Sequence, residues 1–436
     1  MHRIASRLFL YASPEDTSIV NILARLSERM PVKPASWQRP SYDWILSYRL
    51  QARRILSFDQ TYRVSGNLWQ AYLTFLLVTD DNPFTRACAE GLRDSALREL
   101  ALKEAGTWMD LFHFDFSAMD AWAGAPFFTS LRDDWDNDGR NEGNEAGDRL
   151  VVLRERLASA GDPDTFMALL ADFIEQHGCG LSSIHSAFRI APEPDFRLEP
   201  AERSPEITLD TLVGYESQKK RMTENVTSFL RGLPYNHMRL YGDAGTGKST
   251  SVKALLNLYE RDGLRLVEVR KQQLDRLELV LRACRQRANR YLIYIDDLSF
   301  EENETGYKHL KAVIEGGVSD IPANVMLVAT SNRRQLVRED WKDRSDMERV
   351  GDVHRSDTLE EKLSLAARFG CAISFGIPSV RDFHDIVRTL YRREGGTALS
   401  EEELLRLADA WEIRHGGVSG RTARQFVRTV IAREKG

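Results

Sequence analysis

The sequence predicts an α/β protein built on a parallel β-sheet with helices on both faces. Two observations lead to this fold class, and the chain length adds an expected number of domains. A glycine-rich run at 242–249 lies between a short apolar run and a helix-periodic segment. From about residue 210 onward, short apolar runs alternate with helical patterns, which is typical of a sheet whose strands are joined by helices. The chain has 436 residues, so about two or three domains are expected.

Residues 206–377 are predicted to form the α/β domain. Its sheet is expected to have five parallel strands, since five segments are short, apolar and rich in β-branched or aromatic residues: Met238 to Tyr241, Leu264 to Val269, Tyr291 to Ile295, Val325 to Thr330, and Ala372 to Phe375. After Pro378 the apolar residues follow a helical period, and Ser400 with Glu403 forms a capping signal. Residues 378–436 are therefore predicted to be a small helical lid.

Residues 1–205 are predicted to be a mainly helical domain. Six of the eight tryptophans, from Trp37 to Trp135, lie in it. We interpret them as core residues, and an exposed aromatic binding surface is the alternative. An acidic insertion near 133–148 interrupts this domain. Its run Asp134 to Glu145 fits the calcium-loop template, with oxygen ligands at positions 1, 3, 5 and 12 and Gly at position 6. A solvated acidic loop is the alternative interpretation.

Composition excludes several classes of protein. The net charge is -5 and the charges are mixed along the chain, so no global field attracts nucleic acid or an anionic membrane. The four cysteines have no metal-like spacing, and the first residues contain no long apolar signal region; we therefore expect a reduced, cytoplasmic location. No stretch is long and apolar enough to be inserted in a membrane.

The glycine-rich run indicates a phosphate-binding loop. Its glycines allow backbone N–H groups to turn toward phosphates, Lys248 adds a positive charge, and the Ser249 hydroxyl completes a Mg²⁺ shell. The helix that follows adds its positive dipole end. A glycine-rich turn without a ligand is the alternative. The residues predicted to bind the nucleotide here are Gly242, Asp243, Ala244, Gly245, Thr246, Gly247, Lys248, Ser249 and Thr250.

Two further strands end in polar side chains. Asp296 and Asp297 directly follow the buried strand that ends at Ile295, and ligands of open α/β sheets bind at that edge. We expect Asp296 to hold Mg²⁺ and Asp297 to orient or activate the attacking water. Asn332 follows the next strand and is expected to hold that water or the γ-phosphate. Helix capping by the aspartates and ordinary turn chemistry at Asn332 are the alternatives.

Together these motifs resemble an AAA+ ATPase over about residues 207 to 430. The resemblance implies ATP and Mg²⁺ as cofactors. It makes Asn332 the sensor-1 residue and places its strand between the phosphate-loop strand and the Asp296 strand. The segment 359–370 is similar to one in bacterial replication initiators that carries an arginine finger, which points to Arg368 acting on a neighbouring subunit. Ser419-Gly420-Arg421-Thr422-Ala423-Arg424 resembles the sensor-2 motif, which implies Arg421, or Arg424 one turn later.

Val213-Gly214-Tyr215, before a predicted helix, is similar to the adenine-side loop of the same superfamily. Each arginine also has a structural alternative: Arg368 as a cap at the end of its helix, and Arg421 and Arg424 as part of a solvated helix face. The segments that begin at Leu240, Asp296 and Ser356 resemble, more closely, a prokaryotic ATP-binding AAA+ family of unknown function. One departure from the wider superfamily is Asp297, where Glu is common.

We therefore expect an ATP hydrolase that couples its nucleotide state to the remodelling or loading of a macromolecular partner, either a protein or a nucleic acid. Self-association is expected from the arginine-finger motif. A nucleotide-dependent conformational switch with little hydrolysis is the alternative, which the shorter side chain of Asp297 favours. A phosphotransferase acting on a small acceptor is a third hypothesis. The Arg368 and Arg421 motifs make it less favoured than the ATP hydrolase.

Overall fold

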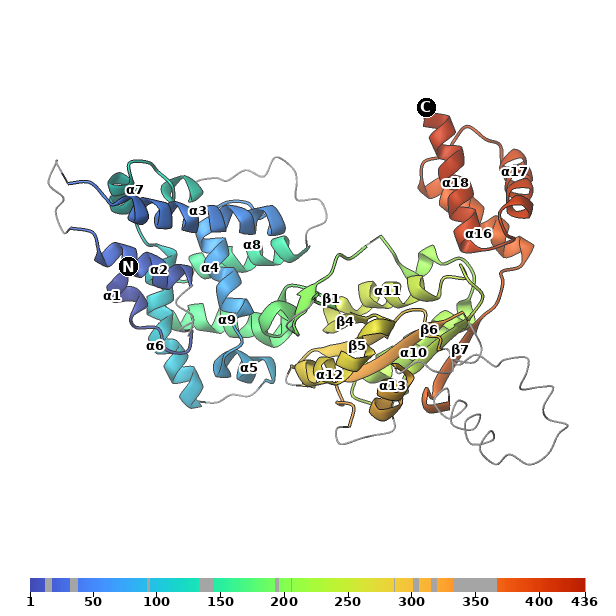
Figure 1. Cartoon of the computed structure of the whole chain (residues 1–436), viewed down its shortest axis with the longest axis horizontal. Helices are drawn as coiled ribbons and strands as arrows, with labels where there is room; N and C mark the ends of the chain where they lie inside the picture. The colour runs from blue at the N-terminus through green and yellow to red at the C-terminus, as the bar shows by residue number, and fades with distance from the viewer. Residues whose placement is uncertain are drawn as a thin grey trace. The chain divides into compact units, whose positions relative to one another are not determined.

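The structure is a computed structural model. The chain forms two compact units, Met1–His185 and Ser186–Gly436 (Figure 1). The described residues are 1–11, 18–31, 38–91, 95–132, 145–192, 196–204, 206–285, 287–300, 306–314, 320–332 and 367–435. Within these ranges no helix combines the length and the apolar character that a membrane crossing requires.

The first unit is helical. Its described helices are α1 (His2–Ala5), α2 (Ile19–Glu28), α3 (Tyr42–Tyr62), α4 (Leu68–Thr79), α5 (Pro83–Ala89), α6 (Ser95–Phe112), α7 (Ser117–Ala123), α8 (Glu145–Ala158) and α9 (Pro163–His177), with the short 3₁₀ turns η1 (Thr129–Leu131) and η2 (Gly180–Ser183). Trp44, Trp69 and Trp108 are buried in its core, which confirms the core interpretation for these three. Trp37 and Trp135 lie outside the described residues.

Two buried carboxylates join segments of this unit. Asp120 accepts hydrogen bonds from the Tyr48 hydroxyl at 3.0 Å and the Phe128 N–H at 3.1 Å. It also accepts from the N–H and the hydroxyl of Thr129, at 2.8 and 2.6 Å. Glu104 accepts from the consecutive N–H groups of residues 9, 10 and 11. Because each carboxylate receives several donors, its burial is compensated within the fold.

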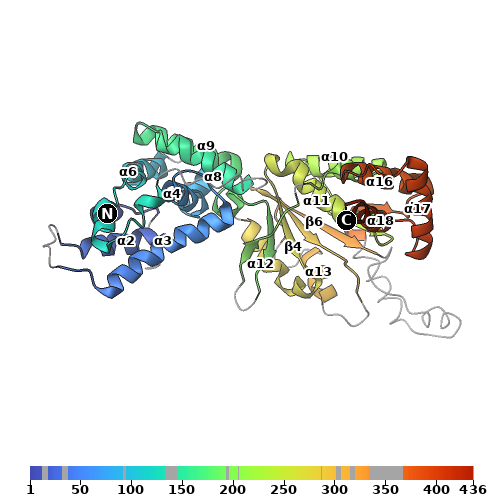
Figure 2. The same ribbon diagram turned by 90° about the horizontal axis from the view of Figure 1, so that it is seen from above.

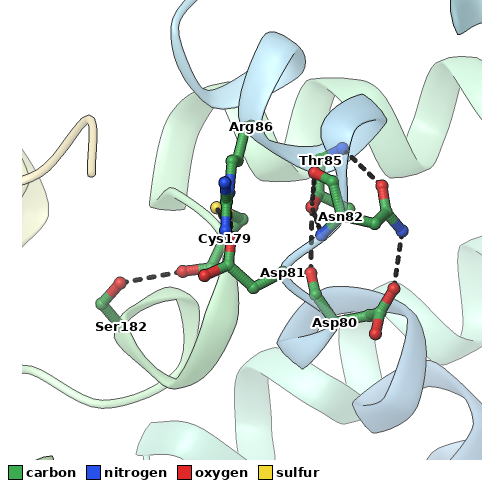
Figure 3. A network of polar contacts seen from close by, with 7 residues as sticks. All are labelled: Asp80, Asp81, Asn82, Thr85, Arg86, Cys179 and Ser182. Atoms are coloured by element: carbon green, nitrogen blue, oxygen red, sulfur yellow. Dashed lines mark hydrogen bonds and ion pairs between the residues drawn. The ribbon is translucent and has the colours of Figure 1, made fainter. Parts of the chain in front are cut away.

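A polar network surrounds the start of α5 (Figure 3). The Asn82 side chain caps the helix by accepting from the Thr85 N–H at 3.0 Å. In turn, the Thr85 hydroxyl accepts from the Asn82 backbone N–H at 3.0 Å. Asp80 accepts from the Asn82 amide at 2.6 Å. Arg86 pairs with Asp81 at 2.7 Å, and the Cys179 thiol lies 3.9 Å from the same Asp81 oxygen. The network therefore fixes the α4–α5 turn against the segment that follows α9.

The second unit contains a mostly parallel sheet in the order β2-β1-β4-β5-β6-β3-β7. Its strands are β1 (Ala187–Ile190), β2 (Leu198–Pro200), β3 (Met238–Gly242), β4 (Leu264–Val269), β5 (Arg290–Ile295), β6 (Val325–Ser331) and β7 (Cys371–Phe375). All five predicted strands are present, each within one residue of its predicted ends. β6 lies between β3 and β5 and is parallel to both, as the family resemblance implied.

The prediction of a five-stranded sheet is wrong, because the described sheet has seven strands. β1 adds to the edge of β4 in parallel, and β2 pairs with β1 antiparallel. Both lie in the range that the sequence assigned to the helical domain. They contain four and three residues, too few for an alternating pattern to be recognised. The pairing covers what would otherwise be an open edge at β4.

Helices cover both faces of the sheet (Figure 2). On one face lie α10 (Glu216–Leu230) and α11 (Lys248–Tyr259), and on the other lie α12 (Leu277–Arg285) and α13 (Gly306–Ile314). Val252, Leu255 and Leu256 of α11 pack into the core that α10 shares with the sheet, as the helical period predicts. The short 3₁₀ turns η3 (Leu209–Thr211), η4 (Glu260–Asp262) and η5 (Lys271–Arg276) connect these elements.

The end of the chain forms three helices, α16 (Val380–Arg393), α17 (Glu401–Arg414) and α18 (Gly420–Lys435), drawn in red in Figure 1. They have a small core of their own, which includes Phe383, Val387 and Val427. Ser379 forms a capping box with Asp382, and the Ser400 side chain accepts from the Glu403 N–H at 3.3 Å. The capping signal at Ser400 is thus used as the sequence predicts.

Candidate functional site

A cavity of about 670 Å³ opens at the carboxyl ends of β3, β5 and β6, with α16 and α18 forming its other wall. Parallel strands bring their carboxyl ends to one edge of a sheet, so side chains distant in sequence meet there. The predicted site residues that line this cavity are Val213, Tyr215, Gly245, Thr246, Gly247, Lys248, Ser249, Thr250, Asp296, Asp297, Asn332 and Arg421.

The loop between β3 and α11 depends on glycine at two positions. Gly242 has φ 136°, and a Cβ added there would lie 2.0 Å from the Phe375 carbonyl oxygen. Gly247 has φ 93° and forms the N-cap of α11. Positive φ and close backbone approach both exclude ordinary side chains. The sequence therefore forms a tight loop that aims the first N–H groups of α11 at the cavity, where an anion is favoured.

Lys248 is 5% exposed, and its ammonium group donates to the carbonyl oxygens of Gly242 at 2.8 Å and Asp243 at 2.7 Å. Burial lowers the pKa of Lys248, while the nearby charges of Asp243, Asp297 and Asp296 act in the opposite direction. The ammonium is thus held inside the loop by neutral acceptors. A phosphate oxygen would be a stronger acceptor at the same position, because a charge-assisted bond exceeds a bond to a neutral carbonyl.

Asp296 receives three donors on one oxygen. Its Oδ1 accepts from the hydroxyls of Thr330 at 2.5 Å and Ser249 at 2.9 Å, and from the Asp297 N–H at 3.1 Å. The side chain is exposed to the cavity, although the cavity walls remove part of its water. That desolvation raises its pKa, but the hydrogen bonds outweigh it and the pKa of Asp296 is lowered overall. The carboxylate is therefore fixed in its charged form.

Asp297 and Asn332 are paired. The Asn332 amide donates to Asp297 Oδ1 at 3.0 Å, so the two predicted water-handling residues are in contact. Asp297 has φ 51°, which is uncommon for a residue other than glycine. Its N–H also donates to the Thr330 hydroxyl at 3.0 Å. Thr330 thus stabilises the turn that directs Asp297 toward Asn332.

The Val213-Gly214-Tyr215 segment lies at the same cavity. Tyr215, the residue before α10, has φ 60° and donates its hydroxyl to the Gly376 carbonyl at 2.8 Å. Burial raises the pKa of Tyr215 to about 12, with a further contribution from the charges of Asp382 and Asp243. Ile386 and Leu390 of α16 add apolar surface to the cavity. An apolar wall of this kind suits a flat apolar group such as a nucleobase.

Helix α18 directs three arginines to the cavity. Arg421, Arg424 and Arg428 are spaced at i, i+3 and i+7, which places them on one helix face. The first turn of α18 also contacts the loop directly, because the Gly420 N–H donates to the Gly245 carbonyl at 3.1 Å. Both candidates for the sensor-2 residue are therefore at the cavity.

The structure does not bring every predicted residue to this site. Arg368 is exposed and is not among the residues that line the cavity. Most of its motif, 359–366, lies outside the described residues, and so do residues 134–144 of the candidate calcium loop. Glu145, the last position of that loop, begins α8 and pairs with Arg149 at 3.9 Å.

Several lining residues have no counterpart in the sequence-based site. They are Thr211, Leu212, Thr330, Ile386, Leu390, Gly420, Gln425 and Arg428. A signal for Thr330 existed, because strand alternation places Thr330 on the same face as Val328, which packs on the α10–α11 side. Ile386 and Leu390 follow the ordinary helical period of a core face, so nothing in the sequence separates them from core residues.

The donor set suits Mg²⁺, a hard cation that prefers oxygen ligands and retains several waters. The Ser249 hydroxyl donates its proton to Asp296, so its oxygen lone pairs remain available to a cation. Asp296 is charged, and Lys248 lies in the same cavity. The residues present therefore fit a magnesium ion held by Ser249 and Asp296 beside an anionic ligand.

A glycine-rich loop from β3 into α11 and an acidic pair after β5 lie at the same edge of a parallel sheet, and together they form a P-loop module. Its motifs and the place of β6 between β3 and β5 resemble the AAA+ type. More specifically, the chain belongs to the family described as "Protein of unknown function (DUF815)", whose model matches residues 183–434.

Partial similarity to solved structures was also found. The RuvB Holliday junction branch migration motor of Thermotoga maritima is 15% identical, with 53% of this chain and 67% of that chain covered and a TM-score of 0.36. A point mutant of the same RuvB protein is 16% identical, with 54% and 69% covered and a TM-score of 0.38. The FIGL-1 AAA domain in complex with ADP is 17% identical, with 54% and 77% covered and a TM-score of 0.38. The search of curated proteins gave no match.

Proposed function

We propose that this protein binds and hydrolyses ATP with Mg²⁺ and uses the nucleotide state to move its C-terminal helices. The observation that carries the proposal is the convergence at one cavity of Lys248, the loop N–H groups, and an Asp296 carboxylate oriented by Ser249 and Thr330. Phosphoryl transfer depends mainly on such positioning and on charge stabilisation.

Each part of the site has a role in this mechanism. The loop N–H groups and Lys248 bind the phosphates, with Lys248 exchanging its carbonyl partners for phosphate oxygens. Ser249 and Asp296 would hold Mg²⁺, which supplies charge neutralisation on the β- and γ-phosphates when bound. Asp297 accepts a proton from the attacking water or orients it, and Asn332 shares in holding that water. Val213, Gly214, Tyr215, Ile386 and Leu390 surround the base.

We assign residues 378–436 the role of a lid on the α/β domain, 206–377, and residues 1–205 the role of a separate helical domain. Arg421, with Arg424 one turn later, senses the γ-phosphate from the first turns of α18. Because Gly420 is hydrogen-bonded to the phosphate loop, a change in the loop is transmitted to α18. Arg368 would act on the ATP of a neighbouring subunit, in an oligomer that works in the cytoplasm on a protein or a nucleic acid.

Steady-state release of inorganic phosphate tests this function. We expect ATP hydrolysis that requires Mg²⁺ and rises with protein concentration, because an arginine supplied in trans requires assembly. Asp297→Asn is expected to retain ATP binding and to lower kcat by at least about 100-fold. Asp275→Asn, at an exposed carboxylate outside the cavity, is the control and is expected to behave as wild type.

The second candidate function is a conformational switch that binds ATP and hydrolyses little of it. The bond from Asn332 to Asp297 favours this alternative, because it engages the carboxylate that would otherwise meet water. ATP binding by the wild type without phosphate release, alone or at high protein concentration, would establish the switch. Absence of ATP binding would refute both candidates.

A further inference from the structure

Strand β5 carries two buried tyrosines that face opposite sides of the sheet. Tyr291 and Tyr294 are each 1% exposed, and an odd spacing along a strand places their side chains on opposite faces. Tyr294 packs with Leu292 in the core that α10 and α11 share with the sheet. The same alternation directs Asp296, two residues further on, to the side where Tyr294 lies.

The Tyr294 hydroxyl is buried and makes no hydrogen bond of ordinary length and angle to a described residue. A buried hydroxyl without a good partner destabilises the folded state, so such groups are rare in folded proteins. The hydroxyl nevertheless lies close to the side chains of Asp296, Ser249 and Thr330. The phenol is therefore beside the carboxylate that we assign to Mg²⁺.

The hydrogen bonds of Asp296 are unevenly distributed. Within the described part of the chain, the donors from Thr330, Ser249 and the Asp297 N–H all end on Oδ1. A carboxylate has about four lone-pair sites on its two oxygens. Oδ2 therefore retains capacity to accept, beside a buried hydroxyl that has a proton to give.

We propose that Tyr294 is a positioning residue for Asp296: its hydroxyl donates to the carboxylate, directly or through one water, and fixes the orientation in which Asp296 holds Mg²⁺. The inference rests on the proposed function and deepens it. Partners that orient a metal ligand change metal affinity and activity by about 10- to 100-fold when they are removed. Tyr294 is not a catalytic residue, because it acts through Asp296.

Tyr294→Phe tests the proposal, since it removes the hydroxyl and keeps the ring in the core. The readout is the affinity for a fluorescent ATP analogue during a Mg²⁺ titration, which requires no turnover. We expect the half-saturating Mg²⁺ concentration to rise by about 10-fold and the affinity in EDTA to stay at the wild-type value. Tyr291→Phe is the matched control, at equal burial in the same strand but on the opposite face, and is expected to leave the titration unchanged.

The outcomes separate the two proposals. If wild-type protein does not bind the analogue, or binds it without any effect of Mg²⁺, the proposed function fails. If the wild type responds to Mg²⁺ and Tyr294→Phe gives the same half-saturating concentration, the role of Tyr294 is overturned. An equal loss of affinity with and without Mg²⁺, or an equal shift in Tyr291→Phe, would show a general packing defect and would also overturn it.

Discussion

In the helical unit, Asp120 and Glu104 are buried and accept hydrogen bonds from several segments of the same unit. In the sheet unit, Asp296 and Asp297 stand at the end of β5 and face a cavity. Asp296 has its donors on one oxygen, and Asp297 accepts from Asn332. The first pair joins parts of the fold, whereas the second pair retains capacity for a ligand.

This difference distinguishes carboxylates used within the fold from candidate functional carboxylates, without reference to any relative. A carboxylate whose lone pairs are used within the fold stabilises that fold, and its removal leaves buried donors unsatisfied. A carboxylate that is oriented by neighbours yet faces a cavity is prepared for an external partner. Variants of each kind should therefore change different measured quantities.

The largest expected effect is on ATP binding by Lys248→Ala. Removing a buried cation from the proposed triphosphate site should cost about 4 kcal/mol of binding free energy, which is about 1000-fold in Kd. Isothermal titration calorimetry with ATP and Mg²⁺ measures this change. Lys253→Ala, at an exposed position of the same helix, is the control. Equal affinity in the wild type and Lys248→Ala would refute the assignment of the site.

Asp120→Ala should act on stability and not on the ATP site. The Tyr48 hydroxyl and the N–H groups of residues 128 and 129 would lose their acceptor, so the free energy of unfolding of the helical unit should fall by about 3 kcal/mol. Urea unfolding followed by tryptophan fluorescence reports on this unit, because Trp44, Trp69 and Trp108 lie in its core. ATP affinity should not change.

The control for this substitution is Asp110→Ala, at an exposed carboxylate of α6, which should leave the unfolding curve where it is. A wild-type unfolding curve for Asp120→Ala would contradict the structural role. A loss of ATP affinity in the folded variant would contradict the division between the two kinds of carboxylate.

The smallest effect concerns pH. Burial lowers the pKa of His237, at the start of β3, to about 4, and its Nδ1 accepts from the Leu327 N–H at 3.3 Å. The unfolded chain takes up this proton below about pH 6.5, whereas the folded protein does not until about pH 4. The stabilisation by neutral His237 is therefore complete above pH 6.5 and is lost as the pH falls toward 4.

We expect His237→Asn to reduce the stability difference between pH 7 and pH 5 by about 1 kcal/mol, because the side chain is partly accessible and its pKa effect is partly screened. Urea unfolding followed by circular dichroism at both pH values measures this difference. His113→Asn, at an exposed histidine of the helical unit, is the control. An unchanged pH dependence in His237→Asn would exclude this histidine as its source.

Much of the sheet unit was predictable because its signals are local. Each of the strands β3 to β7 is short and apolar and is bounded by polar or turn residues, so pattern alone located all five within one residue of their ends. The glycine spacing of the loop and the acidic pair after β5 then fixed which edge of the sheet carries the cavity. These features depend on neighbouring residues, which a single sequence displays directly.

The features that the sequence did not reveal depend on tertiary contacts. β1 and β2 are short strands that exist because they complete the edge of β4. Strand alternation indicates the face on which Thr330 lies, but its contact with Asp296 depends on the pairing of β6 with β5. Tyr294 appears in the sequence as one more apolar member of a strand, and what distinguishes it is the face of the sheet on which it lies, with its hydroxyl near Asp296.

The bond between the Gly420 N–H and the Gly245 carbonyl has one more consequence. Both atoms belong to the main chain, so truncating side chains to alanine elsewhere leaves the bond in place. At position 420 itself, however, a methyl group would lie 3.2 Å from the Gly245 oxygen, tighter than atoms of this kind prefer. Gly420→Ala would therefore move α18 slightly away from the glycine-rich loop. Every charged side chain of the cavity would remain present.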